Sequence, residues 1–191
     1  MKRDSTFVLG IEIPSTDPLF VGVIVLAHIP LGIACVVAGI VAMLSRKRRG
    51  NHSTAGSVYY WCLMALFASA TLLSAMRWAE NVHLFTLGAM SFASAWAGRS
   101  ALRRRRPNWV RLHIAGMGLS YVLMLIAFYV DNAKQLPIWQ DLPHFTYWLI
   151  PLAIGAPLIV RALIAHPLAR REAALNRRPP HDEAGDAAGE R

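Results

Sequence analysis

The sequence has few charged residues, and acidic residues are the scarcer sign. Charged side chains make up 16% of its 191 residues and hydrophobic ones 55%, whereas typical soluble domains are about 25% charged. This apolar content excludes an intrinsically disordered chain, which requires low hydrophobicity. Only 11 acidic residues stand against 20 Lys and Arg, so the formal net charge is +9. A nucleic-acid binder is not indicated, because the basic residues lack interleaved aromatics and a recognised motif.

Cysteine and catalytic motifs are also scarce. Cys35 and Cys62 are the two cysteines, they form no CxxC, and both lie in long apolar stretches. This excludes a disulfide framework and a thiol-based zinc or redox motif, and the two thiols are expected to behave as small apolar groups. GxGxxG, Walker, HExxH and GxSxG patterns are absent from the sequence, so hydrolase and nucleotide chemistry have no support. The sequence predicts no catalytic residue.

Long apolar stretches are abundant instead. A membrane-spanning helix needs about 20 apolar residues, and lipid satisfies no backbone hydrogen bonds, so such stretches must be helical. The third stretch is the weakest, because Ser, Gly and Arg99 dilute it. We therefore expect an all-α integral membrane bundle within residues 19–165, with five transmembrane helices at about 19–44, 55–76, 84–102, 110–130 and 145–165.

The two ends of the chain differ from this membrane domain. Residues 1–18 are expected to be an extracytoplasmic segment, and Asp4, Glu12 and Asp17 interrupt any apolar core that a cleavable signal peptide would need. Residues 166–191 change from basic to acidic with Pro, Gly and Ala interleaved. This composition is typical of a disordered tail.

The charges predict the orientation of the five helices. One side would hold 16 of the 20 basic residues and five acidic ones, a net charge of +11, whereas the other side would have a net charge of −2. Basic loops stay in the cytoplasm, so we expect the N-terminus outside and the C-terminus inside a bacterial inner membrane. The basic loops at 46–49 and 103–106 are then topology determinants that also suit anionic lipids.

The histidines form a repeated pattern. His52 and His113 lie at the predicted cytoplasmic ends of the second and fourth spans, 61 positions apart. His83 and His144 lie at the outer ends of the third and fifth spans, also 61 positions apart. This repeat predicts a duplicated helical hairpin, with spans two and three equivalent to spans four and five. Hairpins that cross one bilayer also have similar lengths without duplication.

In a duplicated four-helix core, equivalent helices lie diagonally and their histidines face one another. His52 would then meet His113 at the inner end, and His83 would meet His144 at the outer end. Two opposing imidazoles are the axial ligands of a six-coordinate haem iron. The leading hypothesis is therefore electron transfer across the membrane through b-type haem.

Other residues near the inner pair suit the same ligand. Gly56, Gly116 and Gly118 are expected to leave space for a flat macrocycle beside the helices. Arg111 is a candidate for the haem propionates, because a guanidinium group binds carboxylate well. Each of the four histidines also has a plainer interpretation, as a solvated side chain at the membrane interface.

His28 supports a different hypothesis. It lies inside the first span, about 13 Å below its outer end, and Pro30 leaves the Leu26 carbonyl without its helical partner. Its imidazole could bond that carbonyl, or it could act as an intramembrane functional group. With His83 and His144 it would form an outer zinc or copper site if the first span packs against the third and fifth. A cofactor-free scaffold, assembly or transport component is the further alternative.

Several segments resemble a known family. They are "HIPLG" at His28, "GNHSTAGSVYYW" at His52, "RLHIAGMGLSYVLMLIAFYVDN" from Arg111 and "LPIWQDLPHFTYWLIPLAIGAPLIVRAL" from Leu136. They resemble bacterial predicted membrane proteins with a domain of unknown function, which implies a multi-pass inner-membrane protein without an established activity. The histidine layout is separately similar to the cytochrome b561 type of four-helix core, in which alternate helices pair histidines for two haems. His83 and His144 lie closer to the helix ends than that type implies.

Overall fold

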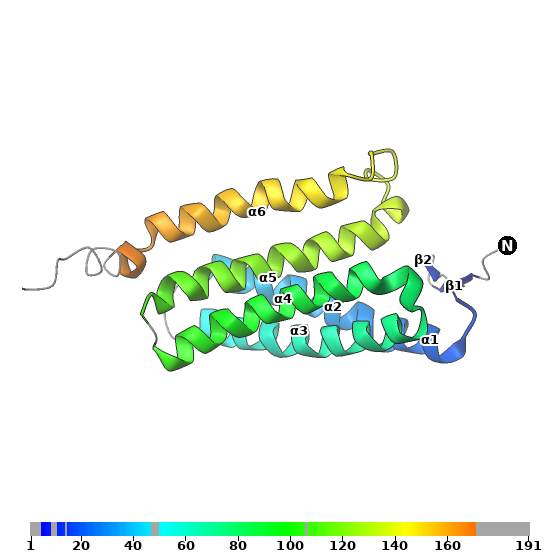
Figure 1. The fold of residues 1–191 in the computed structure, drawn as a ribbon, viewed down its shortest axis with the longest axis horizontal. Coiled ribbons are helices and arrows are strands. Elements are labelled where there is room, and N and C mark those ends of the chain that lie inside the picture. The colour runs from blue at the N-terminus through cyan, green and yellow to red at the C-terminus, as the bar shows by residue number, and fades with distance from the viewer. Residues whose placement is uncertain (1–4, 9–10, 14, 47–49, 106, 171–191) are drawn as a thin grey trace, which may run out of the picture.

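The computed structural model describes residues 5–8, 11–13, 15–46, 50–105 and 107–170. Within this part the chain is mostly helical (Figure 1). An antiparallel hairpin of β1 (Thr6–Val8) and β2 (Ile11–Ile13) precedes the helices. The helices are α1 (Pro18–Val23), η1 (Ile24–His28), α2 (Ile29–Leu44), α3 (Asn51–Met76), α4 (Trp78–Arg104), α5 (Trp109–Asn132), η2 (Ala133–Gln135) and α6 (Thr146–Ala165).

The first span is a continuous helical segment that begins at a well-formed cap. The Asp17 carboxylate accepts hydrogen bonds from the backbone N–H groups of Leu19 at 2.8 Å and Phe20 at 3.2 Å. Pro18 occupies the first helical position, where its missing N–H costs nothing. The segment widens into the π-helical turn η1 just before Pro30, which cannot donate a hydrogen bond. The helix nevertheless continues to Leu44.

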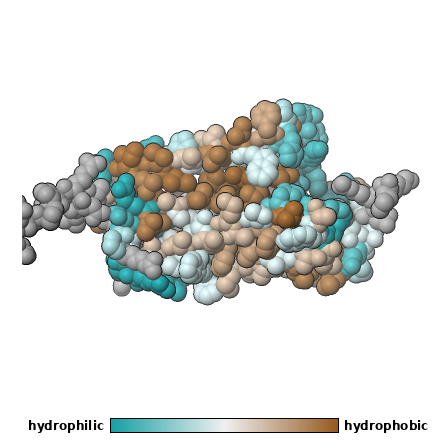
Figure 2. Space-filling view, viewed as in Figure 1, coloured by the Kyte–Doolittle hydropathy of each residue, from teal (hydrophilic) through white to brown (hydrophobic). Residues whose placement is uncertain are grey.

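Four helical segments are long and apolar enough to cross a membrane. They are Pro18–Leu44, Asn51–Met76, Trp109–Gln135 and Thr146–Ala165. The third predicted span, 84–102, coincides with α4, a helix of 27 residues that is less apolar than these four segments. In Figure 2, apolar side chains cover much of the middle of the visible face and hydrophilic ones gather toward its two ends.

The helices do not pack as the predicted hairpin repeat requires. The core lies among α2, α3, α4 and α5, and α6 packs along α5 (Figure 1). The observed bundle therefore includes the first span, which packs on α3, whereas the predicted core holds spans two to five. Close contact explains this, because the Tyr121 ring of α5 lies directly against Gly39 of α2. Any side chain larger than hydrogen at Gly39 would meet that ring.

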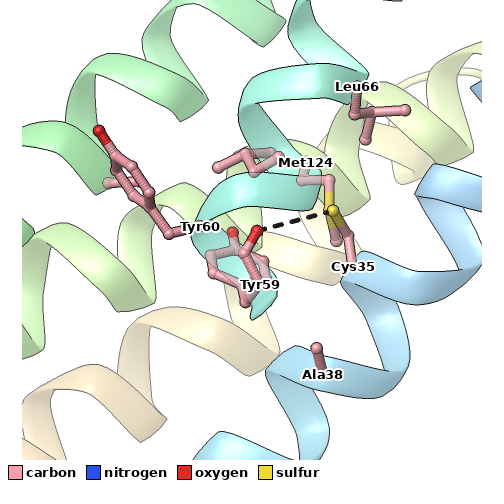
Figure 3. Packing of buried hydrophobic residues seen from close by; sticks show 8 residues of the cluster. Cys35, Ala38, Tyr59, Tyr60, Leu66 and Met124 are labelled. Atoms are coloured by element: carbon pink, nitrogen blue, oxygen red, sulfur yellow. Dashed lines mark hydrogen bonds between the residues drawn. The ribbon is translucent and has the colours of Figure 1, made fainter. Parts of the chain in front are cut away.

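The main buried cluster joins residues from α2, α3, α4 and α5. Cys35 and Ala38 come from α2, Met124 from α5 and Ala95 from α4, and the rest come from α3. Figure 3 shows this cluster, with a dashed line between the Cys35 thiol and Tyr59. The buried Cys35 thiol lies 3.9 Å from the Tyr59 carbonyl. Cys35 and Cys62 are both free thiols, in keeping with their predicted behaviour as small apolar residues.

Candidate functional site

His52 and His113 lie next to each other at one end of the bundle. His52 is in the first turn of α3 and His113 is in the second turn of α5. Their ring centroids are 6.4 Å apart, and the ring planes make an angle of 85°. Both residues are half-buried. The structure therefore brings together the two histidines that the sequence pairs at the cytoplasmic end.

Backbone carbonyls hold both rings in place. His52 Nδ1 lies 2.8 Å from the Ala42 carbonyl oxygen at the end of α2, and His113 Nδ1 lies 3.2 Å from the Gly98 carbonyl oxygen of α4. A carbonyl oxygen only accepts, so Nδ1 carries the proton and donates in each bond. A neutral imidazole of this tautomer has its lone pair on Nε2. Metal-ligating histidines are commonly oriented in this way.

A second polar layer lies deeper in the bundle, behind the histidine pair. Tyr59 Oη and Ser120 Oγ are 2.9 Å apart. Ser120 Oγ donates to the Met117 carbonyl at 2.8 Å, so Tyr59 must donate to Ser120. Ser91 Oγ of α4 donates to the Ser120 carbonyl at 2.7 Å. The three residues Tyr59, Ser91 and Ser120 are buried and are called the polar layer below.

Sequence reasoning missed the polar layer, although a signal for it exists. Tyr59 follows His52 by seven positions, and Ser120 follows His113 by seven positions. Seven residues are about two helical turns, so each polar residue lies on roughly the same face as its histidine and about 10 Å deeper. The same offset of 61 positions therefore applies to both layers.

The glycines do not provide the space that the sequence predicted. A Cβ added at Gly116 would lie 2.6 Å from the Ser94 carbonyl oxygen and 2.9 Å from Gly98 Cα. A Cβ added at Gly118 would lie 2.7 Å from a side-chain carbon of Ile159. Neighbouring helices fill both positions, because small residues allow helices to approach closely in membranes. Gly56 alone of the three has no heavy atom within 4 Å of the added Cβ.

The outer histidine pair is not brought together. His83 on α4 and His144 before α6 are both exposed. The His144 ring contacts the Tyr147 ring at 5.4 Å, and no ring contact joins His144 to His83 within the described ranges. The reason is the position of α6, which packs on α5 instead of α4.

The described residues also do not form the proposed outer metal site. His28 Nδ1 lies 3.0 Å from Ser69 Oγ of α3. Ser69 itself donates to the Leu66 carbonyl, so His28 Nδ1 donates to Ser69. This nitrogen therefore does not bond the Leu26 carbonyl, the partner that the sequence suggested. In the part of the chain that the structure describes, no group of three or more His, Cys, Asp or Glu residues is placed to hold a metal ion.

The remaining predicted site residue lies at the protein surface. Arg111, the propionate candidate, is exposed and lies two positions before His113 on α5. His181 and residues 171–191 of the predicted tail lie outside the described residues, as do residues 47–49 and 106 of the two basic loops. The described basic residues of those loops, Arg46, Arg103, Arg104 and Arg105, are exposed.

Comparisons with known proteins found no match among family models, curated proteins or solved structures. The resemblances based on the histidine segments therefore stay predictions. A function for this chain has to be inferred from the geometry of the site.

Proposed function

We propose that this chain crosses a bacterial inner membrane five times, with its N-terminus outside and its C-terminus inside. The third crossing along the chain is α4, which lies beside α3 and α5 and is as long as they are (Figure 1). Its exposed residues in the middle of the helix carry no charge: Thr86, Met90, Ala93, Trp96 and Ala97. Such a face suits lipid contact, and the biased distribution of basic residues supports the orientation.

We propose further that His52 and His113 would hold the iron of a b-type haem in an electron-transfer protein. The observation that carries this proposal is the geometry of the two rings, whose centroids are 6.4 Å apart. Metal–imidazole bonds of about 2 Å place the centroids of two opposing ligands about 6 Å apart. When bound, the haem would supply a centre that accepts and releases one electron.

The surrounding residues have separate roles in this proposal. The Ala42 and Gly98 carbonyls accept from Nδ1 and orient the two imidazoles. The polar layer closes the site on the membrane side with its hydroxyl groups satisfied. Arg111 would bind propionates at the cytoplasmic surface, where its side chain is exposed.

The position of the pair limits the path of electrons. Electrons would enter or leave at the cytoplasmic end, where His52 and His113 lie. A second centre at His83 and His144 is not part of this proposal, because no ring contact joins these two exposed residues within the described ranges. We therefore propose one haem per chain in place of the two that the cytochrome b561 type of layout implies.

A visible spectrum of the purified protein tests this proposal. Protein from haem-sufficient cells should show a Soret band that shifts on reduction with dithionite. His52→Ala and His113→Ala should each lose the haem, whereas the control His144→Ala should keep the haem-to-protein ratio. Colourless protein that stays colourless after haem is added would refute the proposal. Retention of haem by both inner variants would show that the assigned ligands are wrong.

A cofactor-free scaffold, assembly or transport component is the second candidate. The observation that favours it is that both rings bond backbone carbonyls, which would serve equally to tie the ends of α2 and α4 to α3 and α5. In this case His52→Ala and His113→Ala would lower the free energy of unfolding of a colourless protein. A histidine-based zinc or copper protein is tested by metal analysis of haem-free wild-type protein and of the His28→Ala variant. Bound metal that is lost in His28→Ala would favour the metal protein over the cofactor-free component.

A further inference from the structure

Arg99 is a half-buried positive charge near the C-terminal end of α4. It precedes the end of the helix at Arg104 by five residues, about 8 Å along the axis. Helical side chains tilt toward the N-terminus of their helix, which for α4 is the direction of the membrane centre. The Arg99 guanidinium carbon lies 4.6 Å from the centroid of the Tyr60 ring on α3. Its side chain is therefore directed away from the cytoplasm.

The hydrogen-bonding capacity of Arg99 is poorly used. Its two terminal nitrogens share one acceptor, Ser57 Oγ, at 3.5 Å each. Its Nε is buried and has no hydrogen-bond partner. The ion pair found among the described residues joins Arg77 to Glu80 at the opposite end of α4, so no described carboxylate neutralises Arg99. An unneutralised charge at this depth is costly.

The neighbourhood of Arg99 adds positive charge and no negative charge. Arg103 follows one turn later on α4, so its side chain lies on the same face. Trp61 of α3 and Trp96 of α4 are 53% and 55% exposed, although each is a large aromatic residue. Exposed aromatic rings of this size suit contact with lipid. The site thus combines cations with exposed aromatic residues on both helices.

A row of aromatic rings, one buried and three partly exposed, continues from Arg99 toward the other end of the bundle, along the contact between α3 and α4. The Tyr60 ring contacts the Phe92 ring at 5.9 Å, and Phe92 stacks on Phe67 at 5.7 Å. Phe67 in turn contacts Phe85 at 5.8 Å. A charged end followed by an aromatic track is the pattern expected for a headgroup and its acyl chain.

We propose that Arg99, Ser57 and Arg103 bind the phosphate of an anionic phospholipid from the cytoplasmic leaflet. The phosphate oxygens would satisfy the Arg99 guanidinium and accept a hydrogen bond from Ser57. The acyl chain would lie along Phe92 and Phe67. This site lies between two helices and is distinct from the general attraction of basic loops to anionic lipid. It is also independent of any haem at His52 and His113.

Native mass spectrometry of the full-length protein in detergent tests the site, with phosphatidylglycerol or phosphatidylcholine added. Wild-type protein should retain phosphatidylglycerol in preference to phosphatidylcholine. Arg99→Gln should reduce retention about fivefold or more, the factor that one arginine near a membrane surface supplies. Arg161→Gln, which removes an exposed arginine from α6, should leave retention unchanged. Ser57→Ala should show a smaller loss and keeps the test valid if Arg99→Gln does not fold.

Three results would overturn the proposal. The first is equal retention of phosphatidylglycerol by Arg99→Gln and Arg161→Gln, together with wild-type retention by Ser57→Ala. The second is equal retention of both lipids by the wild type, which would mean that the headgroup charge is not recognised. The third is displacement of the lipid by millimolar inorganic phosphate, which would identify a site for a free anion.

Discussion

The Tyr59 hydroxyl lies 2.9 Å from Ser120 Oγ, and these two residues are 61 positions apart in the chain. His52 and His113, whose rings are neighbours one layer above, are separated by the same 61 positions. Equal offsets in two successive layers require α3 and α5 to run in the same direction and in one register. The two layers therefore form a polar column inside an otherwise apolar bundle.

The polar layer predicts an asymmetry between two variants. Ser120→Ala leaves the buried Tyr59 hydroxyl without its acceptor, so the free energy of unfolding should fall by about 1–3 kcal/mol. Tyr59→Phe leaves Ser120 bonded to the Met117 carbonyl, so the loss should be only about 0.5–1.5 kcal/mol. Unfolding of purified protein by sodium dodecyl sulfate in mixed micelles measures both. Equal losses in the two variants would contradict the assigned direction of the hydrogen bond.

The contact between α4 and α5 predicts that Gly116 tolerates no side chain. Gly116→Ala places a Cβ against the Ser94 carbonyl oxygen and Gly98 Cα, and overpacking of this kind costs about 1–3 kcal/mol. Gly56→Ala is the matched control, because its Cβ meets no heavy atom within 4 Å. The same unfolding measurement should show no loss for Gly56→Ala. A stable Gly116→Ala variant would mean that the helices are further apart than described.

The hydrogen bond between His28 and Ser69 predicts a small energetic coupling between the first span and α3. A double-mutant cycle with His28→Ala, Ser69→Ala and the double variant should give a coupling energy of about 0.6 kcal/mol, typical of interhelical hydrogen bonds in membranes. The cycle with His28→Ala and Ser91→Ala is the control and should give none, because Ser91 bonds Ser120. Zero coupling in the first cycle would leave His28 without this structural role.

The five-span topology predicts the location of two reporter fusions. A reporter after Ala165, at the end of α6, should be cytoplasmic, and one after Gln140, between α5 and α6, should be periplasmic. Both locations depend on α4 crossing the membrane. If α4 stays on the outer side, α5 and α6 are inverted and both reporters exchange sides.

Hydropathy predicted the positions of the long helices closely. The predicted span 110–130 corresponds to Trp109–Asn132, and the span 145–165 corresponds to Thr146–Ala165. The largest difference is in the third span, predicted to begin at residue 84, where α4 begins at Trp78. Its first turns hold Glu80, Asn81 and His83, which hydropathy scores against a span although a helix accommodates them in the interface. Apolar runs report where a helix can be buried in lipid and do not mark its polar ends.

The sequence by itself determined the helical class, the approximate spans and the equal spacing of the histidines, because these depend on local composition and on position along the chain. The tertiary structure alone decided which spaced residues meet. It paired His52 with His113, packed α6 on α5, and used Gly116 and Gly118 for close helix contact. Which helices pack together depends on how well their side chains fit, and the residues that fit together lie far apart in the sequence.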